Sequence, residues 1–283
     1  MLHSSQKDFL KRHIGPSEED QSKMLKKLNY KSLDDLINNT VPEKIHFKGE
    51  LNIGDSNSEY EALRKLKAIS KKNQIYSNFI GMGYYGTYTP HVILRNILEN
   101  PGWYTSYTPY QPEVAQGRLE MLLNFQQMVV DFTGMDIANA SLLDEGTAAA
   151  EAMGLSDRLN KSDSNLVFVS ENCHPQTIEV IKTRAEPIGL KVFVGNEDKV
   201  LEQLKEDIVC GILQYPGTLG DIKDPSEAIS KIHKKNGKAI LACDLLALAK
   251  LKTPRELGAD IAVGSSQRFG IPMGYGGPHA AFF

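Results

Sequence analysis

The sequence is poor in the features that mark secreted, membrane-spanning and nucleic-acid-binding proteins. Its 283 residues contain three cysteines. Their wide spacing fits neither a disulfide framework nor a zinc site, so we expect buried thiols in a reducing compartment and no metal. No apolar stretch reaches the ~18 residues of a membrane-spanning helix. Basic runs of five or more residues are missing and the net charge is -3, which argues against nucleic acid as a partner.

The amino-terminal segment lacks the pattern of a targeting sequence. It has no apolar signal-peptide core, turns acidic by residue 20, and contains no visible mitochondrial presequence. Residues 1–75 are instead charged and helical in pattern. Helices are expected after Ser17, within SLDDLINNTVP, and from Ser56 or Ser58. We interpret this region as a helical arm on a larger domain that spans residues 76–283.

The larger domain begins with a segment crowded with glycine, tyrosine and proline. This segment is too aromatic for a passive linker, and one helix-like run interrupts it from His91 to Glu99. The following run, RLEMLLNFQQMVVDFTGM, has apolar residues at helical spacing and ends at Gly134, a typical C-cap residue.

From about residue 137, short apolar strands alternate with helices. Strands are expected at 166–170, 191–195, 208–216, 238–244 and 260–267, helices at 175–187, 197–206 and 225–236, and a closing strand in HAAFF. This alternation predicts an α/β fold with a mainly parallel sheet covered by helices on both faces. Ligands of such folds bind at the carboxyl ends of the strands, so the loops after the strands form the candidate site.

Three of these loops carry residue types that suit a cofactor. Gly146 and Thr147 open a strong helix whose backbone N–H groups could cradle a phosphate, although an ordinary N-capped helix explains the same residues. His174 is placed to stack on an aromatic ligand, or is a structural or solvated histidine. Asp244 ends a buried strand, so its carboxylate needs a cationic or hydrogen-bonding partner, or serves as a helix N-cap.

The order of these residues is typical of aspartate-aminotransferase-type pyridoxal enzymes, in which a lysine follows. Here the glycine-rich loop GSSQRFGIPMGYGGPHAAFF contains no lysine. The chain nevertheless resembles the N-terminal half of the glycine cleavage system P-protein family, the pyridoxal-phosphate glycine decarboxylases. The resemblance is carried by RHIGPSEED, FIGMGYYGTYTP, the long run from ENPGWYTSYTPYQPE to EGTAAAEAM, and DIAVGSSQRFGIPMGYGGPHAAFF, and it covers nearly the whole chain.

The resemblance implies an aspartate-aminotransferase-like large domain of fold type I for pyridoxal-phosphate (PLP) enzymes. The small C-terminal domain is missing, and we interpret the end after HAAFF as a truncation. The family has two similar halves, fused or separate, and only the C-terminal half binds pyridoxal 5'-phosphate covalently. Gln267 falls at the lysine position and has no nucleophilic amine, while Lys250 and Lys252 lie in the wrong loop. The implied positions of a degenerate cofactor pocket are Gly146, Thr147, His174, Asp244 and Gln267.

The resemblance also gives the aromatic segment a role. The two halves pack like the subunits of a fold-type-I dimer, so that YTPYQPE would face the active site of the other half. The residues expected to line that site are Tyr107, Tyr110, Gln111, Glu113 and Tyr84. The alternative is a loop that only packs the interface between the halves.

The implied activity is decarboxylation of glycine, with transfer of the aminomethyl carbon to the oxidised lipoyl arm of H-protein, which makes the enzyme an oxidoreductase. The implied partners are glycine, the lipoylated H-protein and the C-terminal half or second subunit, and this chain alone is expected to be inactive. A bacterial protein would be cytoplasmic and a eukaryotic one would lie in the mitochondrial matrix. Two other classes are a complete, independent pyridoxal enzyme, which the missing lysine disfavours, and a purely structural or regulatory pseudo-enzyme half.

Overall fold

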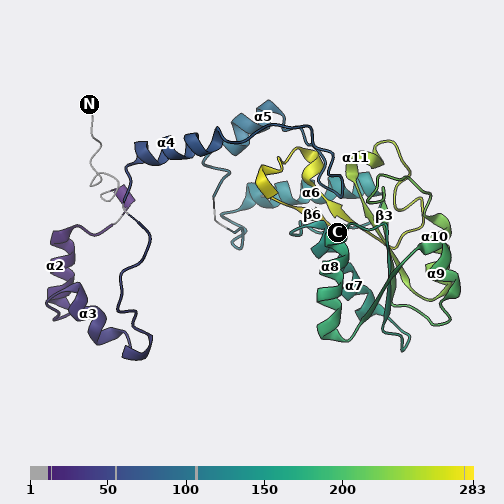
Figure 1. Ribbon diagram of the computed structural model, residues 1–283, viewed down its shortest axis with the longest axis horizontal. Coiled ribbons are helices and arrows are strands. Elements are labelled where there is room, and N and C mark those ends of the chain that lie inside the picture. Colours follow the sequence, from purple (N-terminus) through teal and green to yellow (C-terminus); the bar gives the residue numbers. More distant parts are fainter. Residues whose placement is uncertain (1–11, 14, 55, 106–107, 277) are drawn as a thin grey trace. The chain divides into compact units, whose positions relative to one another are not determined.

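The computed structural model of the protein describes residues 12–13, 15–54, 56–105, 108–276 and 278–283. These residues form two compact units, one up to Ser77 and the other from Asn78 to Phe283 (Figure 1). Within the described ranges, the structure has no helix that is long and apolar enough to cross a membrane.

The unit up to Ser77 consists of short helices whose ends follow from their sequence. They are α2 (Glu18–Lys27), α3 (Leu33–Thr40), the 3-10 turn η1 (Glu43–Ile45) and α4 (Glu59–Ser70). Ser17 and Ser58 each form a capping box with the acid three residues later, which confirms the expected helix starts. No described residue of these helices is buried, so capping and helix propensity, and not a core, define their ends.

The second unit is built on a six-stranded sheet. Its strands are β1 (Leu166–Ser170), β2 (Lys191–Gly195), β3 (Cys210–Tyr215), β4 (Lys238–Cys243), β5 (Ile261–Ser265) and β6 (Ala281–Phe282). Their order in space is β2-β1-β3-β4-β5-β6, and neighbours are parallel except for the antiparallel pair β5 and β6. The predicted mainly parallel α/β sheet is confirmed.

Helices cover both faces of this sheet (Figure 1). They are α7 (Glu145–Leu159) and α8 (Pro175–Ala185, continued by the 3-10 turn Glu186–Ile188) on one face, and α9 (Glu197–Gln203) and α10 (Ser226–Lys234) on the other. Side chains of β1 alternate between the two faces, because Val167 and Val169 pack with α7 and α8 whereas Phe168 packs with α9 and α10. All three cysteines are buried, as predicted.

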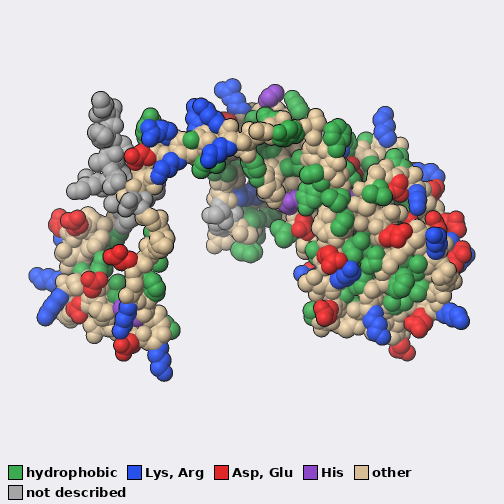
Figure 2. All heavy atoms as spheres, viewed as in Figure 1, with side chains coloured by type: hydrophobic (Ala, Val, Ile, Leu, Met, Phe, Trp, Pro, Cys, Tyr) green, Lys and Arg blue, Asp and Glu red, His purple; other side chains and the backbone are tan. Residues whose placement is uncertain are grey.

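The segment before the sheet exposes a large apolar surface. The predicted helix from His91 is a turn of α-helix, α5 (His91–Ile93), continued by a π-helical turn (Leu94–Leu98). Then α6 (Gln116–Thr133) ends at Gly134, whose φ of 71° confirms the predicted C-cap. Exposed apolar side chains here include Phe79, Ile80, Val92, Leu98, Tyr104, Tyr110, Val114 and Leu123. Figure 2 shows apolar side chains gathered around α5. We call this surface the 79–128 face.

The parallel strands place several loops at one edge of the sheet. Because β1, β3, β4 and β5 are neighbours, the loops after Ser170, Tyr215, Cys243 and Ser265 lie side by side. Leu142 forms a bridge with Ala281 of β6, and Ala281 pairs with the last residue of β5. This bridge brings the start of α7 to the same carboxyl edge, where α11 (Leu245–Leu248) also begins.

Candidate functional site

A cavity lies at this carboxyl edge. Its narrow part, about 20 Å³, has room for one water molecule, and it is lined by Gly83, Tyr85, Glu145, His174, Gln214, Pro216, Cys243, Asp244, Ser265, Gln267 and Arg268. A wider part of about 140 Å³ shares several of these residues and reaches the start of α7, where Tyr84, Gly146 and Thr177 join the lining. The structure therefore brings Gly146, His174, Asp244 and Gln267 to one place.

The start of α7 is a capped helix end. Asp144 Oδ1 accepts a hydrogen bond from the Thr147 N–H at 2.7 Å, and the next three residues, all alanines, are buried. The carboxylate of Asp144 therefore occupies the position that a phosphate would take at the helix N-terminus. Glu145 adds a second acidic group at the same end. Of the two interpretations of Gly146 and Thr147, the geometry favours the N-capped helix.

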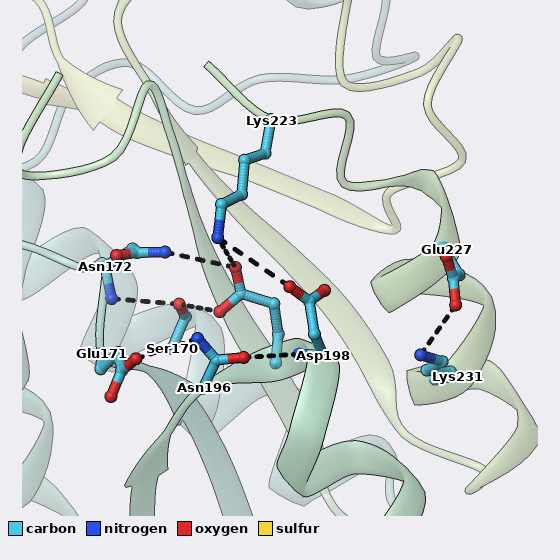
Figure 3. A network of polar contacts seen from close by, with 9 residues as sticks. Ser170, Glu171, Asn172, Asn196, Asp198, Lys223, Glu227 and Lys231 are labelled. Atoms are coloured by element: carbon cyan, nitrogen blue, oxygen red, sulfur yellow. Dashed lines mark hydrogen bonds and ion pairs between the residues drawn. The ribbon is translucent and has the colours of Figure 1, made fainter. Parts of the chain in front are cut away.

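A polar network fixes the loop after β1 (Figure 3). Ser170 Oγ donates to Glu197 Oε2 at 2.6 Å, and Asn172 Nδ2 donates to Glu197 Oε1 at 3.3 Å. Lys223 Nζ stands 3.9 Å from the same carboxylate. Glu197, the first residue of α9, thus holds the loop that leads to His174.

His174 is enclosed by the protein's own groups. Its side chain is almost fully buried, with Nδ1 3.2 Å from Thr218 Oγ1 and Nε2 3.9 Å from Glu145 Oε1. Burial lowers the pKa of His174 to about 4, so the imidazole is neutral at neutral pH. Gly83, at a φ of 85°, packs so closely that a Cβ there would lie 3.0 Å from the imidazole Cδ2. This backbone fills space beside the ring, which favours a structural histidine over a ring that stacks on a ligand.

Asp244 has both kinds of partner that the sequence predicted. Its Oδ1 accepts hydrogen bonds from Arg268 Nε at 3.0 Å and from the Leu246 N–H at 3.2 Å, as the N-cap of α11. The guanidinium of Arg268 also donates to the Gly86 carbonyl at 2.7 Å and lies 5.2 Å from the centre of the Tyr85 ring. The carboxylate is therefore paired within the chain.

Gln267 closes the glycine-rich loop. It is 5% exposed and begins the 3-10 turn Gln267–Phe269. Its Nε2 donates to the Pro278 carbonyl at 3.0 Å, and its backbone N–H donates to Ser265 Oγ at 3.2 Å. A second short turn, Gly274–Gly276, lies between Gln267 and Pro278 in the sequence. An amide that is buried and already hydrogen-bonded has a structural use here, and it offers no nucleophile.

The comparison with known families decides the identity of the fold. The profile described as glycine cleavage system P-protein matches residues 11–283. The chain belongs to the glycine cleavage system P-protein family. It is 82% identical over its full length to glycine dehydrogenase (decarboxylating) of Pelagibacter ubique, and 58% identical over 97% of its length to the protein of that name from Synechocystis. The chain spans only 29% and 28% of those two relatives.

Solved structures agree with membership in the P-protein family. A crystal structure of glycine decarboxylase (P-protein) of the glycine cleavage system, in inhibitor-bound form, matches with a TM-score of 0.85 at 32% identity, over 95% of this chain and 61% of that chain. A cysteine desulfurase from Thermococcus onnurineus shares the fold alone, with a TM-score of 0.50 at 15% identity over 70% of this chain and 50% of that chain. The predicted fold-type-I architecture is confirmed.

The described residues of the tyrosine loop in this P-protein-family chain do not line the cavity. Tyr110 is 86% exposed, Gln111 and Glu113 are also exposed, and the cavity lining includes none of these three described residues. Tyr84 lies apart from them, along the wider part of the cavity. Tyr107 lies outside the described residues. The structure thus groups Tyr84 with the cavity and leaves Tyr110, Gln111 and Glu113 at the surface.

Sequence reasoning missed several residues that line the cavity, and four of them bear on its chemistry. They are Tyr85, Glu145, Gln214 and Arg268. A signal existed for Arg268, because it follows Gln267 in the loop after β5, which neighbours the strand that leads to Asp244. From the sequence, Glu145 was identifiable only as part of a helix start and Gln214 only as part of a strand end. The hydrogen bond between them depends on how α7 packs against the sheet, which the sequence pattern does not give.

Glu145 is the strongly perturbed acid of the cavity. Burial raises the pKa of its carboxyl to about 7, hydrogen bonds from Gln214 and Thr177 oppose the rise, and the negative charges of Asp244 and Asp144 add to it. Only 15% of its side chain is exposed. Folding therefore favours the protonated form of Glu145 near neutral pH.

A glutamine at position 145 is expected to remove a pH-dependent loss of stability. The unfolded chain releases this proton near its ordinary pKa of 4.5 and the folded chain near 7, so stability falls as the pH rises between these values. The total loss in free energy of unfolding between these two pH values is on the order of 3 kcal/mol. Glu145→Gln should match the unmodified chain near pH 5 and exceed it in urea midpoint above pH 7. Glu151→Gln, an exposed acid of the same helix, is the control. Parallel pH profiles of Glu145→Gln and the unmodified chain would contradict the assignment.

Proposed function

We propose that this chain is the N-terminal part of a glycine decarboxylase of the glycine cleavage system, and that it completes the active site of the other half without binding the cofactor itself. The 82% identical relative is named glycine dehydrogenase (decarboxylating), and this chain spans 29% of it. In the proposed assembly, glycine is decarboxylated on PLP bound covalently by the other half, and the lipoylated H-protein accepts the aminomethyl group.

The observation that carries the proposal is the poor fit of PLP to this chain's own pocket. Gln267, at the position where the family resemblance implies the lysine, has its amide bonded to Pro278. The carboxylate suited to a pyridine nitrogen, that of Asp244, is paired with Arg268. The cavity parts hold about 20 Å³ and 140 Å³, whereas pockets for ligands of cofactor size enclose roughly 300–1,000 Å³. The carboxylate of Asp144, which already accepts from the Thr147 N–H at the start of α7, also opposes a phosphate there.

The surface of the second unit supports a partner half. Exposed aromatic and aliphatic side chains are concentrated on the 79–128 face, and contiguous apolar patches of this kind mark interfaces. The tyrosine loop lies within this face, with Tyr110 and Glu113 exposed. In our proposal the face packs on the C-terminal half, and Tyr107, Tyr110, Gln111, Glu113 and Tyr84 contribute to the site there.

Borohydride reduction tests where the cofactor is attached. After reduction of the complete enzyme loaded with PLP, peptide mapping should find the pyridoxyl-lysine outside residues 1–283, because position 267 is glutamine. Gln267→Lys should add at most weak labelling, since the cavity is too small for the ring. A stoichiometric label on Lys250, Lys252 or any other lysine of this chain would overturn the proposal.

A further inference from the structure

Arg268 joins three parts of the chain that are distant in sequence. Its side chain is 17% exposed. Its Nε donates to Asp244 after β4, its Nη1 donates to the carbonyl of Gly86, and its guanidinium lies over the ring of Tyr85. One side chain therefore lines the narrow cavity and contacts both the loop after β4 and residues 85–86 of the aromatic segment.

The segment contacted by Arg268 has no regular secondary structure to hold it. Between residues 82 and 89 the backbone forms a turn and then has neither helix nor strand. Its position therefore depends on side-chain contacts. Gln176 Nε2 donates to the Met82 carbonyl at 2.7 Å, Thr87 Oγ1 donates to the Ile271 carbonyl at 2.9 Å, and Thr89 Oγ1 donates to the Gly270 carbonyl. Arg268 supplies the contact between these two ends.

The chemistry of the pair explains why an arginine stands here. The largely buried carboxylate of Asp244 needs a cation, and a cationic ring nitrogen of a ligand would be one such partner. The planar guanidinium can pair with the acid, donate to a carbonyl in another direction and lie on an aromatic face at the same time. A lysine ammonium is a compact point charge without the planar fork, so it can keep the ion pair but cannot hold all three contacts in this geometry at once.

We propose that Arg268 is a positioning residue that takes the place of a ligand cation in this pocket and clamps residues 82–89 against the glycine-rich loop. The clamp holds Tyr84 at the edge of the wider cavity. It also fixes the course of residues 82–89, which are the early part of the 79–128 face. The effect on catalysis rests on the proposed function, because it requires that this face completes the site of the other half. The clamp itself follows from the contacts alone.

Hydrogen exchange in the complete enzyme tests the clamp directly. In Arg268→Ala and Arg268→Lys, amide exchange within residues 82–89 should speed up roughly ten- to a hundredfold, the equivalent of one lost hydrogen bond to a charged group. Arg268→Lys retains a partner for Asp244, so it keeps the test valid if the alanine variant folds poorly. Arg255→Ala is the matched control, because Arg255 pairs with Asp136 at 2.7 Å outside this cavity; it should leave exchange in 82–89 unchanged. Unchanged exchange in both Arg268 variants overturns the clamp.

A double variant distinguishes loss of the clamp from the destabilising effect of an unpaired, buried carboxylate at Asp244. Asp244→Asn added to Arg268→Ala should recover thermal stability, because no unpaired carboxylate remains, and should not restore protection of residues 82–89. Recovery of protection as well would overturn the clamp in favour of a charge effect. Glycine–bicarbonate exchange on the same proteins should show a lower kcat in Arg268→Lys. Faster amide exchange with normal kcat and KM would leave the clamp standing and count against the proposed function.

Discussion

Glycine decarboxylation by the complete enzyme is expected to fall about ten- to a hundredfold for each of Tyr107→Phe and Tyr110→Phe. In the proposed assembly each change would remove one phenolic hydrogen bond to a charged group in the other half, worth roughly 1.5–3 kcal/mol. Pro109 between them fixes its own φ near about -65° and biases Thr108 toward extended backbone. A stiff loop presents both hydroxyls with little loss of entropy when glycine arrives.

The expected result depends on contacts that this chain does not make by itself. Tyr110 is 86% exposed, so its hydroxyl gains a buried partner only in the assembled enzyme. The assay is glycine–bicarbonate exchange, with the size of each variant checked in parallel. Tyr60→Phe, an exposed tyrosine of α4, is the control for loss of a surface hydroxyl. Near-normal exchange in both single variants and in the double would reduce this half to a scaffold.

Gly264→Ala is expected to destabilise the chain by about 3 kcal/mol or more, at the upper end of overpacking effects. Gly264 is the last but one residue of β5, where a Cβ would stand 2.2 Å from the backbone oxygen of Cys243 and 2.7 Å from the ring of Phe282. A backbone atom cannot rotate away as a side chain can, so β4 and β5 must separate. Their separation would also pull Asp244 away from Arg268.

A glycine in a helix provides the matched control for this substitution. Gly154 lies within α7, and a Cβ there would approach nothing closer than the flexible end of Arg158, at 3.5 Å. Gly154→Ala should therefore stabilise the chain by about 0.5–1 kcal/mol. Thermal unfolding of the two variants gives the comparison. A melting temperature for Gly264→Ala equal to that of the unmodified chain would contradict the strand geometry.

Much of the sheet could be predicted from sequence because apolar runs and burial coincide there. The strands at 166–170 and 191–195 match to the residue. The strand expected at 208–216 forms only over Cys210–Tyr215, although Ile208 and Val209 are fully buried. Apolar residues report burial, and they do not report whether the backbone pairs with a neighbouring strand. Strand ends are therefore less predictable than strand positions.

The location of the site could be predicted from the sequence, but the interactions of its residues could be predicted much less well. Parallel topology brings the ends of β1, β3, β4 and β5 together, so His174, Asp244 and Gln267 had to meet. Pattern reasoning could not separate a phosphate turn from an N-capped helix at Gly146, because both need the same small residues at a helix start. The ion pair between Asp244 and Arg268 joins two loops. The order of β4 and β5 places both residues at one edge of the sheet, but the sequence does not tell which side chains pair there.

The exposed 79–128 face has a consequence for the synthesis of the protein. If the parent is the fused enzyme, this half leaves the ribosome first, while more than twice its own length remains to be translated. At about 5–20 residues per second, the remainder takes on the order of a minute. Throughout that interval Phe79, Val92 and Tyr104 stay in water at the surface of a sheet domain that has already folded. The nascent chain is therefore a natural substrate for chaperones that shield apolar surfaces until the second half can cover them.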